Sequence, residues 1–399
     1  MNKKISLGVA ISLVAIGCAI TFVLTWAVSL NIYNSKIGSS EKYEGIYAKL
    51  REMDTAVRTH YIGSINDDTL ADSVLKGYVS GIGDKYAEYL PANSYYEFQQ
   101  TTEGVVQGAG IEAAADGSGY LVVSAVYKGS SAEINGGQAG DVITEINGKS
   151  LLNYTENEAL EQLSGAIGTK LALKILRNGE EIGVNLVRQQ LEIESVTGRV
   201  INEKIGFISI TAFNAKTAEQ FSGVLDELIE AGVQALVIDV RNNLGGSVAA
   251  LKPMLNHFIT TAIVATAEYS DGSRKTLVET DSTEVISLPM AVLVDGNTAS
   301  ASELFACALR DNCGAVLVGE QTRGKAVMQS VYELTDGSAV RVTTAKIYTP
   351  KSGCYDGEGL KPDYVTELAA GVSFDMLTDD TDTQLQKALE VLASVLPTE

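Results

Sequence analysis

The sequence predicts an α/β multidomain fold, because three patterns follow one another along the 399 residues. From 36 to 98, apolar residues recur at three- and four-residue spacing, which is typical of amphipathic helices. From 99 to 190, short alternating runs are separated by glycine-containing turns, which predicts a small strand-rich domain. From 191 to 399, apolar strand runs alternate with helical segments, and this order favours a core of βαβ units around a mixed sheet.

The first 35 residues have a different character. Lys3 and Lys4 precede an uncharged run from Ile5 to Ser35, which is long enough to span a bilayer. No A-x-A-like cleavage site follows Val28 closely, as a cleaved signal peptide would require. The sequence therefore predicts a signal-anchor transmembrane helix over 1–35, in a single-pass protein of the cell membrane whose remainder is extracytoplasmic.

Charge and composition exclude several kinds of partner. The formal net charge is −20, which disfavours nucleic acid as a partner. The sequence contains no phosphate-binding glycine loop, no paired cysteines at zinc-site spacing and no H-E-x-x-H motif, so we expect neither a cofactor nor a metal. Cys307, Cys313 and Cys354 are an odd number of cysteines after the anchor, which does not indicate a disulfide framework.

The region from 36 to 98 is expected to be helical throughout. Tyr43 and Ile46 begin the apolar face of one helix, and a second helix starts near Asp68. Residues 81–86, with the sequence GIGDKY, end that second helix. Two roles for the region stay open, namely simple packing and homodimerisation through its helices.

The block from 99 to 190 carries two short signals. Residues Gly108, Ala109, Gly110 and Ile111 form a small loop that enters a strand. Residues 140–148 read GDVITEING, which predicts a turn, a strand and a hairpin.

The block from 191 to 399 opens with a strand over Ile205–Ile210 and continues with a second strand over Ala235–Val240. The second strand leads into residues 239–246, with the sequence DVRNNLGG, and a helical run follows from Val248 to Phe258. Two glycines between a strand and a helix can offer free backbone N–H groups to an anion. Read alone, the same pattern is an ordinary βα turn. A closing helix is expected over Asp382–Val395.

The stretch from 291 to 329 carries the strongest chemical signal. An apolar strand and a turn lead to Ser300 at the start of a helix, and Ser300-x-x-Glu303 is a capping box, which by itself only begins a helix. Lys325 adds a possible base, because burial can lower a lysine pKa until the amine carries no proton. The apolar residues after Lys325 would desolvate it, and Gln329 can hydrogen-bond the amine without adding charge.

These motifs resemble those of the C-terminal processing (tail-specific) serine peptidases, which carry A-S-A-S-E, here 299–303, and G-K-x-x-x-Q, here 324–329. The resemblance implies that Ser300 is the nucleophile, Lys325 the general base and Gln329 the residue that orients the lysine. The segment 239–246 resembles the family's D-x-R-x-N-x-G-G. This resemblance implies that the oxyanion of the reaction intermediate would accept hydrogen bonds from the backbone amides of Gly246 and Ala301. Gly245 is the alternative to Gly246.

Residues 140–148 resemble the most specific part of a PDZ domain, which implies a PDZ domain over 99–190, inserted before the peptidase core of 191–399. The resemblance also implies that Gly108, Ala109, Gly110 and Ile111 bind the terminal carboxylate of a peptide added as a strand. Ser131 stands where PDZ domains of this family usually have a proline. This departure bears on how strongly the domain would bind a peptide.

The function implied is that of a membrane-anchored serine endopeptidase, which cleaves protein or peptide substrates with free C-termini near those ends. The alternative is a catalytically inactive PDZ scaffold that binds C-terminal peptides without cutting them.

Overall fold

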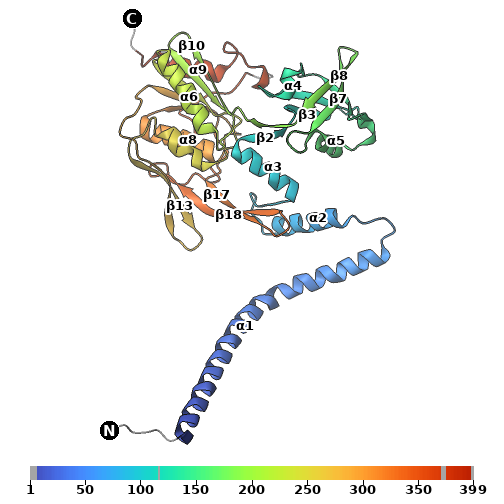
Figure 1. The fold of residues 1–399 in the computed structure, drawn as a ribbon. Helices are drawn as coiled ribbons and strands as arrows, with labels where there is room; N and C mark the ends of the chain where they lie inside the picture. Colours follow the sequence, from blue (N-terminus) through green and yellow to red (C-terminus); the bar gives the residue numbers. More distant parts are fainter. Residues whose placement is uncertain (1–6, 116, 370–373, 397–399) are drawn as a thin grey trace. The chain divides into compact units, whose positions relative to one another are not determined.

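The computed structural model describes residues 7–115, 117–369 and 374–396, and it divides into two compact units, Met1–Val74 and Leu75–Glu399 (Figure 1). The first unit contains α1 (Leu7–His60) and the start of α2 (Asp67–Ser80). Lys3 and Lys4, which belong to the expected anchor, lie outside the described residues.

The membrane anchor expected over 1–35 is not supported by the structure. Over the part of the chain that is described, no helix has the length and apolarity that a membrane span needs. Homodimerisation through the N-terminal helices likewise stays a prediction.

The block from 191 to 399 contains a six-stranded mixed sheet in the order β10-β11-β12-β15-β16-β19. β10 is antiparallel to β11, and every following pair is parallel. Helices α6 (Thr217–Glu230) and α8 (Ala301–Cys313) make the crossovers of two βαβ units. The strands are β10 (Val196–Ile201), β11 (Ile205–Ile210), β12 (Ala235–Asp239), β15 (Met290–Val294), β16 (Val316–Gly319) and β19 (Tyr364–Val365).

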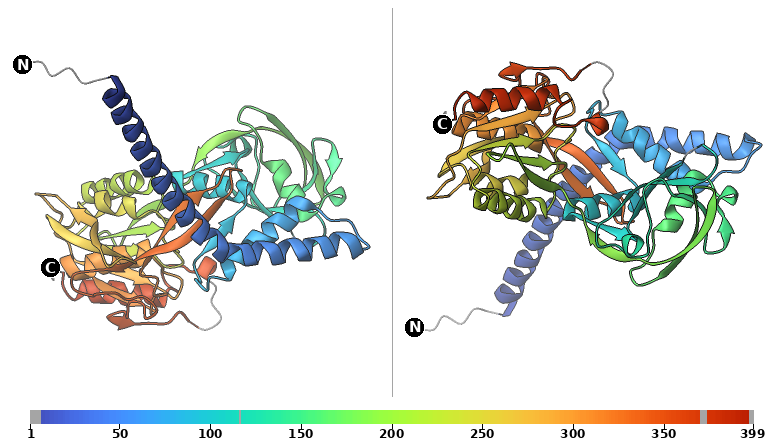
Figure 2. Two further views of the ribbon diagram at one scale, coloured as in Figure 1. Left: turned by 90° about the horizontal axis from the view of Figure 1, so that it is seen from below. Right: turned by 90° about the horizontal axis from the view of Figure 1, so that it is seen from above.

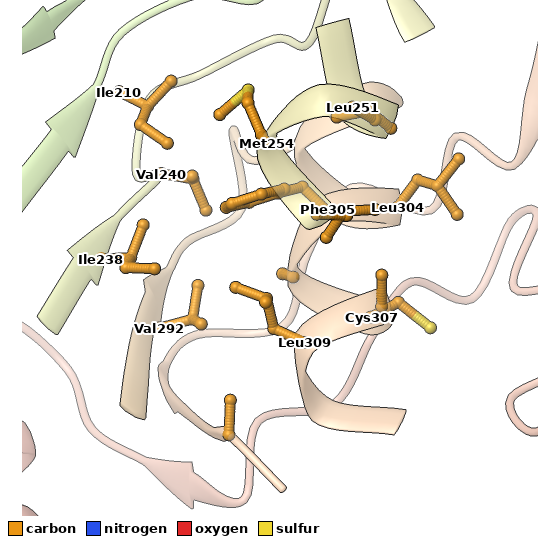
Figure 3. Close-up of a cluster of buried hydrophobic side chains, with 14 of the residues drawn as sticks. Ile210, Ile238, Val240, Leu251, Met254, Val292, Leu304, Phe305, Cys307 and Leu309 are labelled. Atoms are coloured by element: carbon orange, nitrogen blue, oxygen red, sulfur yellow. The ribbon is translucent and has the colours of Figure 1, made fainter. Parts of the chain in front are cut away.

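Helices cover both faces of this sheet, as Figure 2 shows for α6 and the red α9 (Thr383–Ala393). Successive side chains of a strand point to opposite faces, so Ile238 packs with α6, α7 and α8 while Val237 packs with α9. Figure 3 shows α8 side chains such as Phe305 meeting the first face. A strand that is buried on both faces needs an unbroken apolar run, which explains the composition of β12 and β15.

The expected helix over 248–258 is shorter in the structure, where it forms the turn η2 (Val248–Ala250) and the single turn α7 (Leu251–Leu255). Pro253 lies inside this segment and has no N–H to donate to a preceding carbonyl, which limits the helix.

A second sheet carries five antiparallel strands, with the order β1-β18-β13-β14 and with β17 also paired to β18. It joins distant segments, because β1 comes from the region expected to be wholly helical and pairs with β18 near the end of the chain. The strands are β1 (Glu88–Leu90), β13 (Ala262–Tyr269), β14 (Arg274–Thr280), β17 (Val327–Glu333) and β18 (Ala339–Tyr348).

Between α3 (Ala92–Glu103) and the core lies the strand-rich block, with its own buried cluster around Leu121, Ile143 and Leu171. Its main sheet has the order β3-β4-β5-β7-β8, with β6 paired to β5, and β2 pairs separately with β9. The strands are β2 (Val105–Gly108), β3 (Ile111–Ala115), β4 (Leu121–Val126), β5 (Val142–Ile146), β6 (Lys149–Ser150), β7 (Lys170–Arg177), β8 (Glu180–Val187) and β9 (Gln189–Glu192). The helical segments are α4 (Ser131–Ile134), η1 (Leu151–Asn153) and α5 (Glu156–Leu163), and η3 (Phe374–Met376) lies far along the chain before α9.

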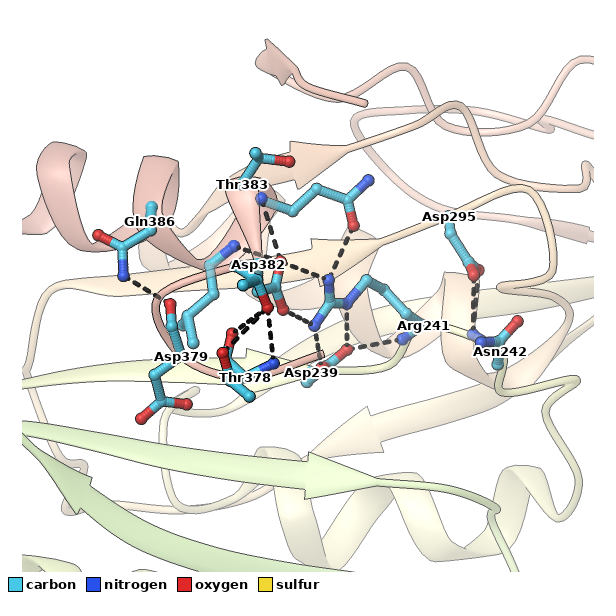
Figure 4. Close-up of polar contacts among 12 residues, drawn as sticks. Asp239, Arg241, Asn242, Asp295, Thr378, Asp379, Asp382, Thr383 and Gln386 are labelled. Carbon is cyan, nitrogen blue, oxygen red and sulfur yellow. Dashed lines mark hydrogen bonds and ion pairs between the residues drawn. The ribbon is translucent and has the colours of Figure 1, made fainter. Parts of the chain in front are cut away.

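A buried ion cluster ties α9 to the loop after β12 (Figure 4). The Arg241 guanidinium donates to Asp239 at 2.7 and 3.0 Å and to Asp382, the N-cap of α9, at 2.7 and 3.0 Å. It also donates to the Gln384 side chain at 2.8 Å. Burial disfavours the charge, but the two carboxylates outweigh this effect and raise the pKa of Arg241. Of the two carboxylates that neutralise Arg241, one therefore comes from the N-cap of α9.

Replacing Asp382 with alanine should lower the free energy of unfolding by about 3 kcal/mol, because a buried cation loses one carboxylate partner. Urea denaturation at neutral pH measures this change. The control is Asp380→Ala, which removes an exposed carboxylate two residues away. Equal stability of the two variants would show that the Arg241–Asp382 pair contributes nothing.

Candidate active site

Ser300 lies at the junction of β15 and α8, in a backbone conformation that serine rarely adopts. Its φ is 57° and its ψ is −117°, whereas the N-cap Ser130 has the ordinary extended values of −78° and 162°. A non-glycine residue in such a region costs about 1–3 kcal/mol, and strained residues of this kind cluster at functional sites. This strained backbone distinguishes Ser300 from an ordinary helix cap. Ser300 is also only partly buried.

The buried carboxylate of Glu303 connects the serine loop to the lysine loop. One oxygen accepts the N–H groups of Ser300 at 2.9 Å and of Lys325 at 2.8 Å. The other accepts the N–H of Gly324 at 2.8 Å and the hydroxyl of Thr322. The capping box read from the sequence captured only the first of these four contacts. The other donors lie about twenty residues further along the chain, where a local motif gives no signal.

Lys325 is partly buried beside the wholly buried Ala326. Burial, helped by the positive charges of Arg341 and Arg323, holds the pKa of Lys325 below the ordinary lysine value. Its amine lies 4.9 Å from the centre of the Tyr86 ring. Among the contacts of the described residues, no hydrogen bond joins this amine to the Ser300 hydroxyl.

Gln329 is the third residue of β17, opposite Thr343 of β18 and directly after a bulge between Met328 and Gln329. The ladder with β18 already starts at Val327, so Gln329 lies within the strand and does not begin it. Its side-chain nitrogen is buried and has no hydrogen-bond partner within the described chain. The structure therefore leaves the Gln329 amide available, but it records no contact with Lys325.

Gly245 lies against Ser300, whereas its neighbour Gly246 lies against the backbone of Phe213. A methyl group on Gly245 would come within 2.9 Å of the Ser300 Cβ and 2.8 Å of the Ala301 nitrogen. The N–H of Gly245 donates to the Asn243 side chain at 2.9 Å. In the described part of the chain, by contrast, the N–H groups of Gly246 and Ala301 have no partner. This distribution favours Gly246 over Gly245 as one donor of an oxyanion hole.

One side chain and one backbone carbonyl join the glycine loop to the serine loop. The Asp295 carboxylate accepts the N–H groups of Asn242, at 3.0 and 3.1 Å, and of Thr298, at 2.8 Å (Figure 4). The Asn243 carbonyl accepts the Ala299 N–H at 3.0 Å. These hydrogen bonds link the two loops directly.

Asp311 lies near the far end of α8, away from the residues that pack around Ser300. Its carboxylate accepts the Ser352 hydroxyl at 2.9 Å and contacts the Cys307 sulfur at 3.5 Å. Asp311 therefore braces α8 against the segment after β18.

The loop at 108–111 joins β2 to β3 in the strand-rich block. The carbonyls of Ala109 and Gly110 are used inside the domain, accepting from Ala132 at 2.9 Å and Tyr127 at 3.0 Å. Within the described residues, the N–H groups of Ala109 and Gly110 have no backbone partner. The loop therefore offers donors for an anionic group, as a carboxylate-binding loop must.

Ser131, which replaces the usual proline, has a role of its own, because its hydroxyl accepts the Val187 N–H at 2.9 Å. This bond ties α4 to the end of β8. No group of three or more His, Cys, Asp or Glu side chains in the described ranges is arranged to hold a metal ion.

Comparisons with known proteins match two regions of the chain to known families. Residues 204–366 match peptidase family S41, and residues 99–176 match the PDZ domain. The chain is 29% identical to the carboxy-terminal processing protease CtpA of Bacillus subtilis, over 99% of this chain and 86% of that protein. It is 31% identical to the carboxyl-terminal-processing protease of Synechocystis, over 78% of this chain and 74% of that protein.

A solved S41 protease from Bacteroides fragilis shares the fold, with 18% identity, a TM-score of 0.51, and coverage of 86% of this chain and 97% of that one. These findings confirm the α/β fold with its PDZ domain. The chain therefore belongs to the C-terminal processing peptidases of family S41 and is a serine-type peptidase.

Proposed function

We propose that the chain is an endopeptidase that cleaves protein substrates near their C-termini with a Ser300–Lys325 dyad. The observation that carries this proposal is the single buried Glu303 carboxylate, which accepts the backbone N–H of both residues. Such a link supports a fixed relation between nucleophile and base. It also favours an active enzyme over an inactive PDZ scaffold.

In the proposed reaction, the neutral amine of Lys325 takes the hydroxyl proton of Ser300 as its oxygen attacks the peptide carbonyl. The tetrahedral oxyanion accepts hydrogen bonds from the N–H groups of Gly246 and Ala301. The lysine then gives its proton to the departing amine, and a water molecule releases the acyl group by the reverse sequence. Gln329 orients the amine without adding a charge that would favour its protonated form.

Ser300→Ala should stay folded and lose more than about 10³-fold in kcat/KM, because the nucleophile is removed. Lys325→Arg should lose activity as well, since arginine remains protonated and cannot act as a base. A quenched fluorescent peptide, with its products identified by mass spectrometry, measures both rates. The control is Lys346→Arg on β18, which changes an exposed lysine. Parental turnover in Ser300→Ala or Lys325→Arg would remove that residue from the mechanism.

We further propose that the PDZ loop Gly108–Ile111 binds the free C-terminal carboxylate of the substrate. The uncommitted N–H groups of Ala109 and Gly110 support this role. Amidating the C-terminus of a peptide should weaken its binding to the Ser300→Ala protein about tenfold or more, because charge-assisted hydrogen bonds are lost. Isothermal titration calorimetry with matched acid and amide peptides measures the difference. Equal affinities would exclude carboxylate recognition.

The extracytoplasmic location is a proposal supported by the sequence of residues 3–35, with two lysines before a long uncharged run. Full-length protein should remain in the membrane fraction after an alkaline carbonate wash. External protease should digest its peptidase core in intact spheroplasts. Release by the wash, or protection from the external protease, would contradict this location.

A further inference from the structure

The loop Gly83–Ala87, between α2 and β1, has no part in the mechanism proposed above. Asp84 fixes it to β18, because its carboxylate accepts the Thr343 N–H at 3.0 Å and the Tyr86 N–H at 2.9 Å. Burial raises the pKa of Asp84, but these hydrogen bonds outweigh it and hold the pKa below its usual value. The β1–β18 ladder begins directly after the loop and pins its other end.

The ring of Tyr86 contacts the amine of Lys325. The Lys325 Nζ lies 4.9 Å from the ring centre, and the Nζ of Lys85 lies 4.6 Å from the same centre. A cation within about 6 Å of an aromatic face is attracted by the ring quadrupole, whereas a neutral amine gains little. The contact with the ring therefore stabilises the protonated form of Lys325 relative to the neutral form.

The loop also contacts β18, the strand that pairs with the strand of Gln329. Thr343, whose N–H binds Asp84, is the direct cross-strand partner of Gln329. The loop is therefore attached to β18 at the position opposite Gln329.

The charges facing the Lys325 amine come from four elements. Arg341 on β18 and Arg323 in the lysine's own loop disfavour the ammonium form. Asp84 in the Gly83–Ala87 loop and Glu303 on α8 favour it.

We propose that Tyr86, held on β18 by Asp84, is a positioning residue for the general base Lys325. The ring face receives the ammonium that forms when Lys325 takes the proton of Ser300, and it keeps the amine in place until the proton passes to the leaving group. This inference rests on the proposed Ser300–Lys325 mechanism.

The first test compares Tyr86→Phe, which keeps the ring face, with Tyr86→Leu, which removes it. Tyr86→Phe should retain the parental pH profile of kcat/KM. In Tyr86→Leu the ammonium loses a favourable contact, so the rising limb should move to lower pH by about half a unit to one and a half units. The maximal rate should also fall several-fold. The control is Tyr96→Leu on α3, which removes an exposed tyrosine.

The second test measures the protonation of Lys325 directly and does not require that the protein cleave a peptide. Acetic anhydride modifies the neutral amine, and peptide mass spectrometry measures the extent of Lys325 modification against pH in the Ser300→Ala background. The pH of half-maximal modification should fall in Tyr86→Leu and not in Tyr86→Phe. If the parent fails to cleave peptides, the proposed function fails, while this measurement still reports the Tyr86–Lys325 contact.

An unchanged labelling curve in Tyr86→Leu would overturn the proposal, and so would a Tyr86→Phe enzyme that behaves like Tyr86→Leu. If circular dichroism shows that Tyr86→Leu does not fold, Asp84→Asn replaces it. This variant removes a charge that favours the ammonium and weakens the attachment of the loop, so its labelling curve should shift in the same direction. No shift in Asp84→Asn would again overturn the proposal.

Discussion

The active region depends on the burial of one carboxylate. Glu303 is wholly buried, and an ionised carboxylate is costly to remove from water unless donors surround it. Its donors come from the first turn of α8 and from the loop before β17. Neither segment can satisfy the charge alone, so the stable arrangement is the one in which Ser300 and Lys325 are both in place.

The parallel sheet brings the other components to the same edge. β12 and β15 are adjacent and parallel, so the glycine loop after one strand and the serine turn after the other emerge side by side. Gly245 permits this close approach, because any side chain there would collide with Ser300 and Ala301. The positions of the Gly246 and Ala301 N–H groups thus follow from the order of the strands and from the absence of a Cβ atom on Gly245.

The parts that the sequence predicts well are those determined by local pattern. The strand Ile205–Ile210 agrees residue for residue with β11, because its apolar run is bounded by turn residues. The start of β17 and the contact between Tyr86 and Lys325 have no local signal in the sequence, because both depend on contacts with β18. Gln329 illustrates the limit, since the ladder with β18, and not the local sequence, sets the start of its strand.

The ion cluster around Arg241 makes the loop after β12 depend on α9. During synthesis the loop that carries Gly246 emerges well before Asp382, so its arginine has only one of its two buried carboxylate partners. A copy truncated before α9 would keep every residue assigned to the chemistry and yet lack half of that counter-charge. The loop that carries Gly246 therefore depends on a helix whose N-cap follows Arg241 by 141 residues in the sequence.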